Sequence, residues 1–111
     1  MNTLRNSVQL VGHLGKDPEL TNLDKGKKLA RVSIAVNEFY TTAKGEKTNN
    51  TQWLNLIAWD KKAEYLSNYL AKGNEVMIQG KLSSRSYEDK SGQTKYVTEI
   101  VVNEIYKINK P

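Results

Sequence analysis

The sequence predicts an all-β domain: a five-stranded Greek-key barrel with one helix between the third and fourth strands. Five segments alternate apolar and polar residues with a period of two, which is typical of half-buried strands. One segment, between the third and the fourth of them, repeats its apolar residues at helical spacing instead. A chain of 111 residues is long enough for one such core, so we expect one domain over residues 1–108 and a short end at 109–111.

The first strand is expected over residues 8–14. Leu10 and Leu14 fall on one of its sides, because side chains alternate across a strand. Gly12 lies on the same side, where a glycine marks a bend or the close approach of another backbone. A short extended segment is expected to follow at residues 19–23, between two turns.

The second strand is expected over residues 29–40. Its inward row alternates with polar or small residues and consists of Ala30, Val32, Ile34 and Val36. Residues 41–50 are mostly polar, with Gly45 in the middle, and are expected to form a mobile loop.

The third strand, residues 51–60, carries both tryptophans of the chain. Its two faces hold Leu54, Leu56 and Ala58 on one side, and Trp53, Asn55, Ile57 and Trp59 on the other. At about 3.3 Å per residue the indoles lie roughly 20 Å apart, too far to stack on each other. Two separate indoles on the face opposite the core need either a second apolar layer or a flat ligand.

A helix is expected after the third strand. Asp60 can cap its N-terminus, and Lys72 with Gly73 is expected to end it, because a cation suits a helix C-terminus and glycine tolerates the left-handed conformation that follows. The apolar stripe of this helix consists of Ala63, Leu66 and Leu70.

The last two strands are expected over residues 75–87 and 94–108, joined by a hairpin turn. The inward row of the fourth strand consists of Val76, Ile78, Gly80 and Leu82. Its outward row is cationic and ends in a ring, with Lys81, Arg85 and Tyr87. The order of three β-strands, one helix and two β-strands suits the oligonucleotide/oligosaccharide-binding barrel. In that fold, the face of the middle β-strands binds single-stranded nucleic acid.

The composition favours a polyanionic partner and restricts the chemistry. Lys and Arg total 17 against 12 Asp and Glu, a formal net charge of +5, and the cations are scattered as on a folded basic surface. The absence of cysteine removes disulfides, thiolate catalysis and cysteine-bound metals. No apolar run approaches the roughly 20 residues of a membrane span, and the N-terminus lacks a secretory signal, so we expect a cytoplasmic protein with no membrane partner.

Short motifs follow one another along the chain: Val11-Gly-His-Leu-Gly15-Lys-Asp-Pro18-Glu19, Thr51-Gln-Trp53, Tyr69-Leu-Ala-Lys-Gly73, Gly80-Lys-Leu82, Ser91-Gly-Gln-Thr-Lys-Tyr96 and Glu99-Ile-Val-Val. Their order and spacing resemble the bacterial single-stranded DNA-binding protein family, over residues 4–106. The resemblance implies a barrel without cofactor or catalysis that binds single-stranded DNA in replication, recombination and repair. It also implies a homotetramer, with a dimer as the alternative, associated with the nucleoid in the cytoplasm.

The resemblance implies which residues contact DNA. The stacking aromatics of the family fall on Tyr40, Trp53, Trp59 and Tyr87. Strand parity independently turns all of these outward except Tyr40, which shares parity with the core-like Ile34 and Val36 and would need a bulge or a bend. Cations beside the rings would neutralise phosphates, and the candidates are Lys61, Lys72, Lys81, Arg85 and Lys95.

Two features depart from the family. Asn55, which we include in the site, stands where many members have arginine, so one phosphate contact is expected to be missing or to come from another cation. The sequence ends in Tyr106-Lys-Ile-Asn-Lys-Pro111, without a glycine-rich linker and acidic tip. Recruitment of repair and replication enzymes through such a tail is therefore not expected, unless the sequence is part of a longer chain.

Alternatives stand beside this interpretation. The tryptophans could pack in a core or a subunit interface instead of binding bases. The barrel could also be an assembly module whose aromatics face a protein partner. RNA is a further possible ligand, because base stacking and phosphate contacts do not distinguish the two sugars. An enzyme such as a nuclease is disfavoured, because the sequence shows no acidic metal cluster or activated nucleophile. His13 is expected to be structural, since a lone imidazole makes neither a metal site nor a triad. The tyrosines expected to pack are Tyr65, Tyr69, Tyr96 and Tyr106.

Overall fold

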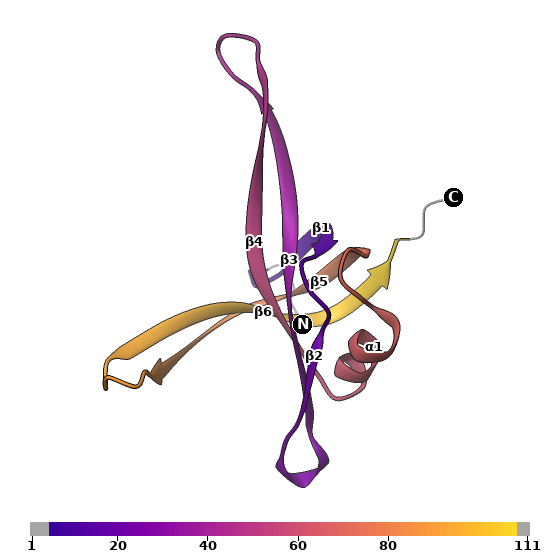
Figure 1. Cartoon of the computed structure of the whole chain (residues 1–111), viewed down its shortest axis with the longest axis vertical. Coiled ribbons are helices and arrows are strands. Elements are labelled where there is room, and N and C mark those ends of the chain that lie inside the picture. Colours follow the sequence, from indigo (N-terminus) through magenta and orange to yellow (C-terminus); the bar gives the residue numbers. More distant parts are fainter. Residues whose placement is uncertain (1–4, 109–111) are drawn as a thin grey trace.

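A barrel of five strands forms the centre of the molecule, and three hairpins project from it (Figure 1). The structure, a computed structural model, describes residues 5–108. The barrel strands are β1 (Val8–Leu14), β3 (Lys28–Thr41), β4 (Lys47–Trp59), β5 (Glu75–Glu88) and β6 (Thr94–Lys107). The short β2 (Glu19–Asn22) pairs with β3, and α1 (Lys61–Tyr69) stands between β4 and β5 in the chain. The predicted barrel, with one α-helix between its third and fourth strands, is confirmed.

The barrel closes in the order β1-β5-β6-β4-β3, with β3 returning to β1. The closing pairs are His13 with Ala35 and Leu14 with Ile34. A Cβ atom at Gly12 would lie 2.3 Å from the carbonyl oxygen of Ala35, so the expected close backbone approach at Gly12 is confirmed. Beside β4, β6 runs parallel, which brings the tryptophan strand next to a strand from the far end of the chain.

The hydrophobic core fills the barrel and extends under α1. Its largest fully buried side chains are Ile34, Leu56, Leu66, Val76, Ile78 and Ile100. They come from four of the barrel strands and the helix, as the predicted inward rows require. The helix α1, which lies at one side of the barrel in Figure 1, adds Ala63 and Leu66 to this core.

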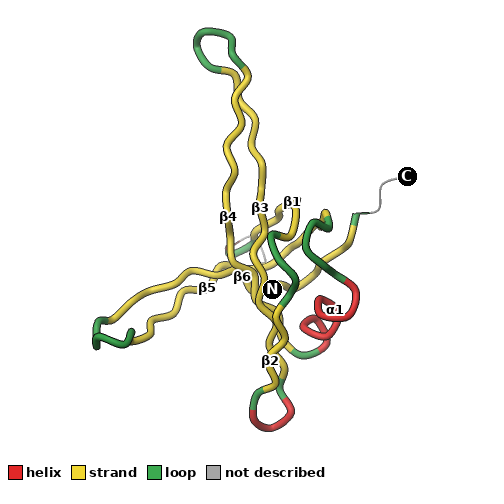
Figure 2. The backbone as a smooth tube through the Cα atoms, viewed as in Figure 1, coloured by secondary structure: helices red, strands yellow, loops and turns green. Residues whose placement is uncertain are grey.

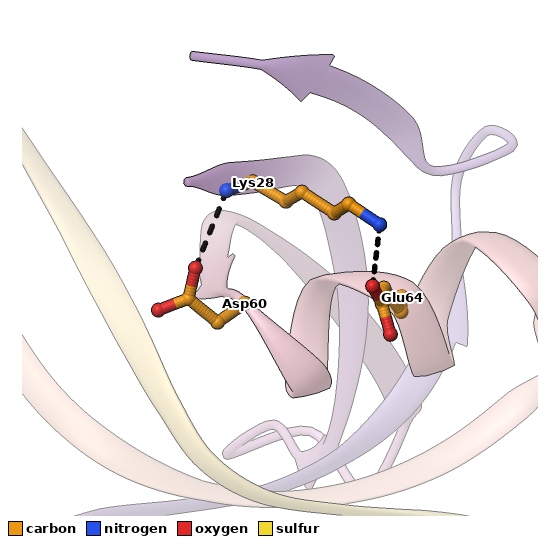
Figure 3. Close-up of polar contacts among 3 residues, drawn as sticks. All are labelled: Lys28, Asp60 and Glu64. Atoms are coloured by element: carbon orange, nitrogen blue, oxygen red, sulfur yellow. Dashed lines mark hydrogen bonds and ion pairs between the residues drawn. The ribbon is translucent and has the colours of Figure 1, made fainter. Parts of the chain in front are cut away.

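The start of α1 is tied to β3 through Lys28 (Figure 3). The backbone amide of Lys28 donates to Oδ1 of Asp60 at 3.3 Å, and the Lys28 ammonium group pairs with Glu64. The predicted capping of the helix by the Asp60 side chain is therefore wrong, because this carboxylate accepts its bond from β3 instead. The backbone of Asp60 makes the sharp turn from strand to helix with a φ of 53°.

The end of α1 also differs from the prediction. The helix ends at Tyr69, and Leu70 is already extended, so Lys72 and Gly73 belong to the connection that follows. The Oδ1 atom of Asn74 accepts the backbone amide of Ala71 at 2.8 Å, which offers the chain a turn in place of a further helical bond. No helix within residues 5–108 has both the length and the apolar character needed to span a membrane.

The β3–β4 and β5–β6 hairpins extend well beyond the barrel (Figure 2). Pairing of β3 with β4 continues without interruption to Thr41 and Lys47, so the predicted loop over residues 41–50 is wrong in its length. Polar residues continue the ribbon because both of its faces lie in solvent there, and no alternation is required. Leu82, predicted to point inward, is 49% exposed where the β5–β6 hairpin leaves the barrel.

Candidate nucleic-acid interface

The two indoles lie on the outward face of β4, as the alternation predicts. Leu56 and Ala58 are buried on the other face, whereas Trp53 is 62% exposed and Trp59 is 40% exposed. Asn55 lies between the indoles on the same face and is also exposed. The face thus presents two separate flat apolar surfaces with an amide group between them.

The turn after β1 supports the ring of Trp53. A Cβ atom at Gly15 would lie 2.5 Å from Cζ3 of Trp53 and 2.9 Å from Oγ of Ser33. The backbone amide of Gly15 donates to the carbonyl oxygen of Ser33 at 2.9 Å, which holds the turn on β3. The absence of a side chain at Gly15 therefore allows the indole to lie directly over the turn.

A polar pocket lies beside Asn55, where β3 and β4 face the base of the β5–β6 hairpin. It is lined by Lys16, Arg31, Val32, Asn55, Leu56, Arg85 and Glu99. In the register of the two strands Arg31 is opposite Ile57 and Ser33 is opposite Asn55, so Arg31 is the diagonal neighbour of Asn55 on one face. The exposed guanidinium of Arg31 thus provides a cation next to the position where the sequence indicated a missing one.

A second pocket, the Trp59 pocket, is more apolar. It is lined by Leu23, Leu29, Arg31, Ile57, Trp59, Ser83, Arg85, Glu99 and Val101. Arg31, Arg85 and Glu99 line both pockets, so the two are adjacent, and we call them together the central groove. The structure brings the predicted residues Asn55, Trp59 and Arg85 together in it.

Three charged residues of the central groove were not predicted as site residues: Lys16, Arg31 and Glu99. The alternation of the second predicted strand already indicates that the Arg31 side chain points outward. Its position beside Asn55 depends on the register between β3 and β4. Glu99 stands among β-branched residues of β6 and reaches the groove because β6 runs beside β4. Both positions depend on pairings between different strands, and the alternation within one strand cannot predict such pairings.

Arg85 is held at the centre of the groove. Its Nε donates to Oε1 of Glu99 at 2.9 Å, and the Glu99 side chain is 6% exposed against 47% for Arg85. The hydrogen bond to Glu99 and the negative charge of that carboxylate raise the pKa of Arg85 above its ordinary value. The Cζ atom of Arg85 lies 6.0 Å from the centre of the Tyr87 ring, within the range of a cation–π contact.

The β5–β6 hairpin carries four predicted residues on one face: Lys81, Arg85, Tyr87 and Lys95. Tyr87 and Lys95 are directly opposite each other, and the register keeps the remaining two on the same side. Tyr87 is about half exposed. Tyr96 lies on the other face and is 79% exposed near the end of the hairpin, so the prediction that it packs is wrong for the single chain.

Tyr40 lies near the tip of the β3–β4 hairpin. The register is continuous there, so by parity Tyr40 is opposite in face to Trp53, and Phe39, which was not predicted, shares the face of Trp53. Both rings are exposed and line a hollow at the tip with Thr41 and Lys47. A two-stranded ribbon twists strongly, and the strands cross in Figure 1, so parity at the barrel does not decide which way Tyr40 faces at the tip.

The remaining candidates lie away from the groove. Lys61 is the first residue of α1, and the backbone amide of Lys72 donates to Oδ1 of Asp17 at 2.8 Å. Both side chains are exposed, and neither lines the central groove. Of the tyrosines predicted to pack in this region, Tyr65 packs partly buried against the core, and the ring of Tyr69 lies 5.4 Å from the ring of Tyr65 while its other side is exposed. Tyr106 is exposed in the single chain, so the prediction is wrong for that residue.

Comparison with known proteins agrees with this geometry. The model of the single-strand binding protein family matches residues 5–108. Single-stranded DNA-binding protein 1 of Chlorobaculum tepidum is 40% identical over 101 residues, which are 90% of this chain and 62% of that protein. The chain therefore spans less than two thirds of the length of this relative. A solved structure, Plasmodium falciparum SSB in complex with ssDNA, matches with a TM-score of 0.86 and 29% identity over 94% of this chain and 95% of the other.

Proposed function

The chain belongs to the single-strand binding protein family, and from that premise we propose that it binds and protects single-stranded DNA without reading its sequence. The observation that carries the proposal is the pair of exposed indoles, Trp53 and Trp59, on one face of β4 beside a groove lined by cations. The proposed role lies in DNA replication, recombination and repair, and it consists of binding without catalysis.

Base stacking is the proposed source of affinity without sequence preference. Every base has a π-face, and one stacked base contributes about 1–3 kcal/mol as measured by alanine substitution. Trp53 and Trp59 would accept bases at the barrel, with Tyr87 and Tyr40 extending the path along the two long hairpins. A duplex keeps its base faces stacked inside the helix, so it would find no partner on these rings.

The cations beside the rings are proposed to bind phosphates. Lys16, Arg31 and Arg85 line the central groove, and the outlying candidates are Lys61, Lys72, Lys81 and Lys95. Each neutralised phosphate releases counterions, so the logarithm of the affinity should fall with the logarithm of salt concentration by about 0.7 per contact. Asn55 would then act as a hydrogen-bonding residue between the indoles, while Arg31 supplies the neighbouring charge.

We propose self-association, as a homotetramer or a dimer, through the sheet face away from the groove. Val11, Met77 and Tyr106 lie side by side across β1, β5 and β6, and all three are exposed. Within residues 5–108, the side of β1 that faces β3 pairs only at His13 and Leu14, so most of that edge is available to another strand. Light scattering should report a multiple of the chain mass, and Met77→Glu should lower it; a monomeric wild type would contradict the proposal.

The cellular setting follows from the ligand. We propose that the protein acts in the cytoplasm at the nucleoid, where replication and repair expose single-stranded DNA. We also propose residues 1–108 as the DNA-binding domain. Of this range, residues 1–4 lie outside the described part of the chain, as does the predicted short end at 109–111.

The test is intrinsic tryptophan fluorescence during titration with oligo(dT), at low and at high salt, with duplex DNA as the control. Trp53 and Trp59 are the two tryptophans of the chain, so the signal reports on the proposed platforms alone. Saturable quenching by the single strand, weakened by salt and absent with duplex, is the expected result. Unchanged fluorescence together with unchanged polarisation of a labelled oligo(dT) would contradict the proposal and favour an assembly module.

A further inference from the structure

Glu99 is the one charged side chain that is buried among residues 5–108, and it lies in the central groove. The residue is 5% exposed and lines both the polar pocket and the Trp59 pocket. Burying a carboxylate is costly unless it is paired, and Glu99 pairs with Nε of Arg85 at 2.9 Å. The carboxylate holds Arg85 in place, and its remaining negative charge opposes the binding of a phosphate at this point of the groove.

The surroundings of Glu99 suit a base better than a phosphate. Leu29, Ile57 and Val101 supply an apolar surface, and the indole of Trp59 forms an exposed wall of the same pocket. Its volume of about 440 Å³ lies within the usual range for small-ligand sites. A flat heterocycle can stack on the indole and bring its polar edge toward the carboxylate, while its phosphate remains near the cations of Arg31 and Lys16.

The carboxylate and guanidinium together present a distinct hydrogen-bonding pattern. An ionised carboxylate has about four acceptor sites, of which the bond from Arg85 uses one, and Arg85 has four further N–H donors. A base with an exocyclic amino group beside a ring nitrogen or carbonyl, such as cytosine, offers the complementary donor and acceptor. Uracil and thymine present a carbonyl oxygen where cytosine has its amino group, and this oxygen would face the carboxylate oxygen.

We infer that the Trp59 pocket is a base subsite that prefers a base with an exocyclic amino group, with Glu99 accepting from that group and Arg85 donating to the adjacent acceptor. The inference rests on the proposed binding of single-stranded DNA. One selective subsite among several stacking platforms gives a modest preference along a strand, which is compatible with binding that is otherwise independent of sequence.

The test compares oligo(dC) with oligo(dU), each about 12 nucleotides long, in mildly alkaline buffer. The two strands differ at the pyrimidine edge, and oligo(dC) stacks on itself more strongly than oligo(dU). Self-stacking therefore opposes the expected result, and a preference for oligo(dC) has to come from contacts with the base edge. The wild type should bind oligo(dC) about fivefold or more tightly than oligo(dU). Equal affinities in the wild type would overturn the inference without any variant.

The isosteric variant Glu99→Gln assigns the preference to the carboxylate. Its amide presents a donor as well as an acceptor, so the ratio should fall to near one. Trp53→Ala is the matched control, because Trp53 lies on the same face and outside the pocket: both strands should weaken while the ratio persists. A ratio unchanged in Glu99→Gln would overturn the assignment. Failure of the wild type to bind either strand would instead overturn the proposed function, and the subsite with it.

Discussion

The ring of Trp53 lies directly over Gly15, so closely that a Cβ atom at residue 15 would come within 2.5 Å of Cζ3. The contact joins the turn after β1 to the outward face of β4. We expect Gly15→Ala to displace the indole, because an exposed ring moves more readily than the paired backbone of two strands. Single-strand affinity, measured by fluorescence titration, should fall by up to the ~1–3 kcal/mol of one stacked base.

The control for this effect is the same substitution in a Trp53→Ala background. If Gly15 acts through the indole, the second substitution should add little to the loss from the first. Additive losses in this double-mutant cycle would show that residue 15 acts on binding by another route.

Trp53→Ala and Trp59→Ala should each weaken single-strand binding by about 1–3 kcal/mol, because each removes one stacking surface. The loss of affinity should be larger for oligo(dT) than for duplex DNA, because the bases of a duplex do not stack on either indole. Polarisation of a labelled strand measures the affinity, and thermal unfolding shows that the fold is retained. Tyr69→Ala, which removes an exposed ring outside the groove, is the control. Unchanged affinity in both tryptophan variants would rule out stacking at β4.

The turn of the β5–β6 hairpin should loosen in acid. The hydroxyl of Ser91 and the amide of Gln93 donate to Oδ1 of Asp89 at 2.7 and 3.0 Å, and these bonds, with Ser91 the largest cause, lower the pKa of Asp89. A lowered pKa means that the unfolded turn binds the proton more readily. The ionised Asp89 therefore stabilises the turn fully at a pH above the ordinary pKa of an aspartate, which is about 4. This stabilisation is lost as the pH falls through the lower pKa that Asp89 has in the folded turn.

Amide chemical shifts of Ser91 and Gln93 across an acid titration would measure this change. Asp89→Asn keeps an acceptor oxygen at the same place, so its turn should form with little pH dependence. Shifts that follow the same acid transition in the Asn variant would show that another group is responsible.

The barrel could be predicted because its strands are half-buried where they form it. Alternation located all five barrel strands and the buried stripe of α1, since one face of each element must meet the core. The errors fall where that constraint ends or where a distant partner intervenes. The hairpins extend further than alternation indicated because both faces of a ribbon are solvated, and Asp60 bonds to Lys28 rather than to its own helix because β3 lies beside it.

Only part of the groove could be predicted from single strands. The outward position of Trp53 and Trp59 needs one strand and its parity, so the sequence was sufficient. The placement of Arg31 needs the register of β3 on β4, and that of Glu99 needs the parallel approach of β6 to β4. Pairings between strands distant in the chain are not encoded in any local pattern, so these charges remained unassigned.

The diagonal relation of Arg31 to Asn55 leads to a charge-relocation experiment. We expect Arg31→Asn to weaken single-strand binding and to reduce the salt slope by about 0.7, because one phosphate contact is lost. Asn55→Arg in that background returns a guanidinium to the same pocket from the neighbouring strand, so affinity and slope should both recover. Lys62→Asn, an exposed helix cation outside the groove, removes the same charge and should leave the slope nearly unchanged. If the double variant, which has the wild-type net charge, does not regain affinity, a guanidinium on β4 cannot replace Arg31 in binding the phosphate.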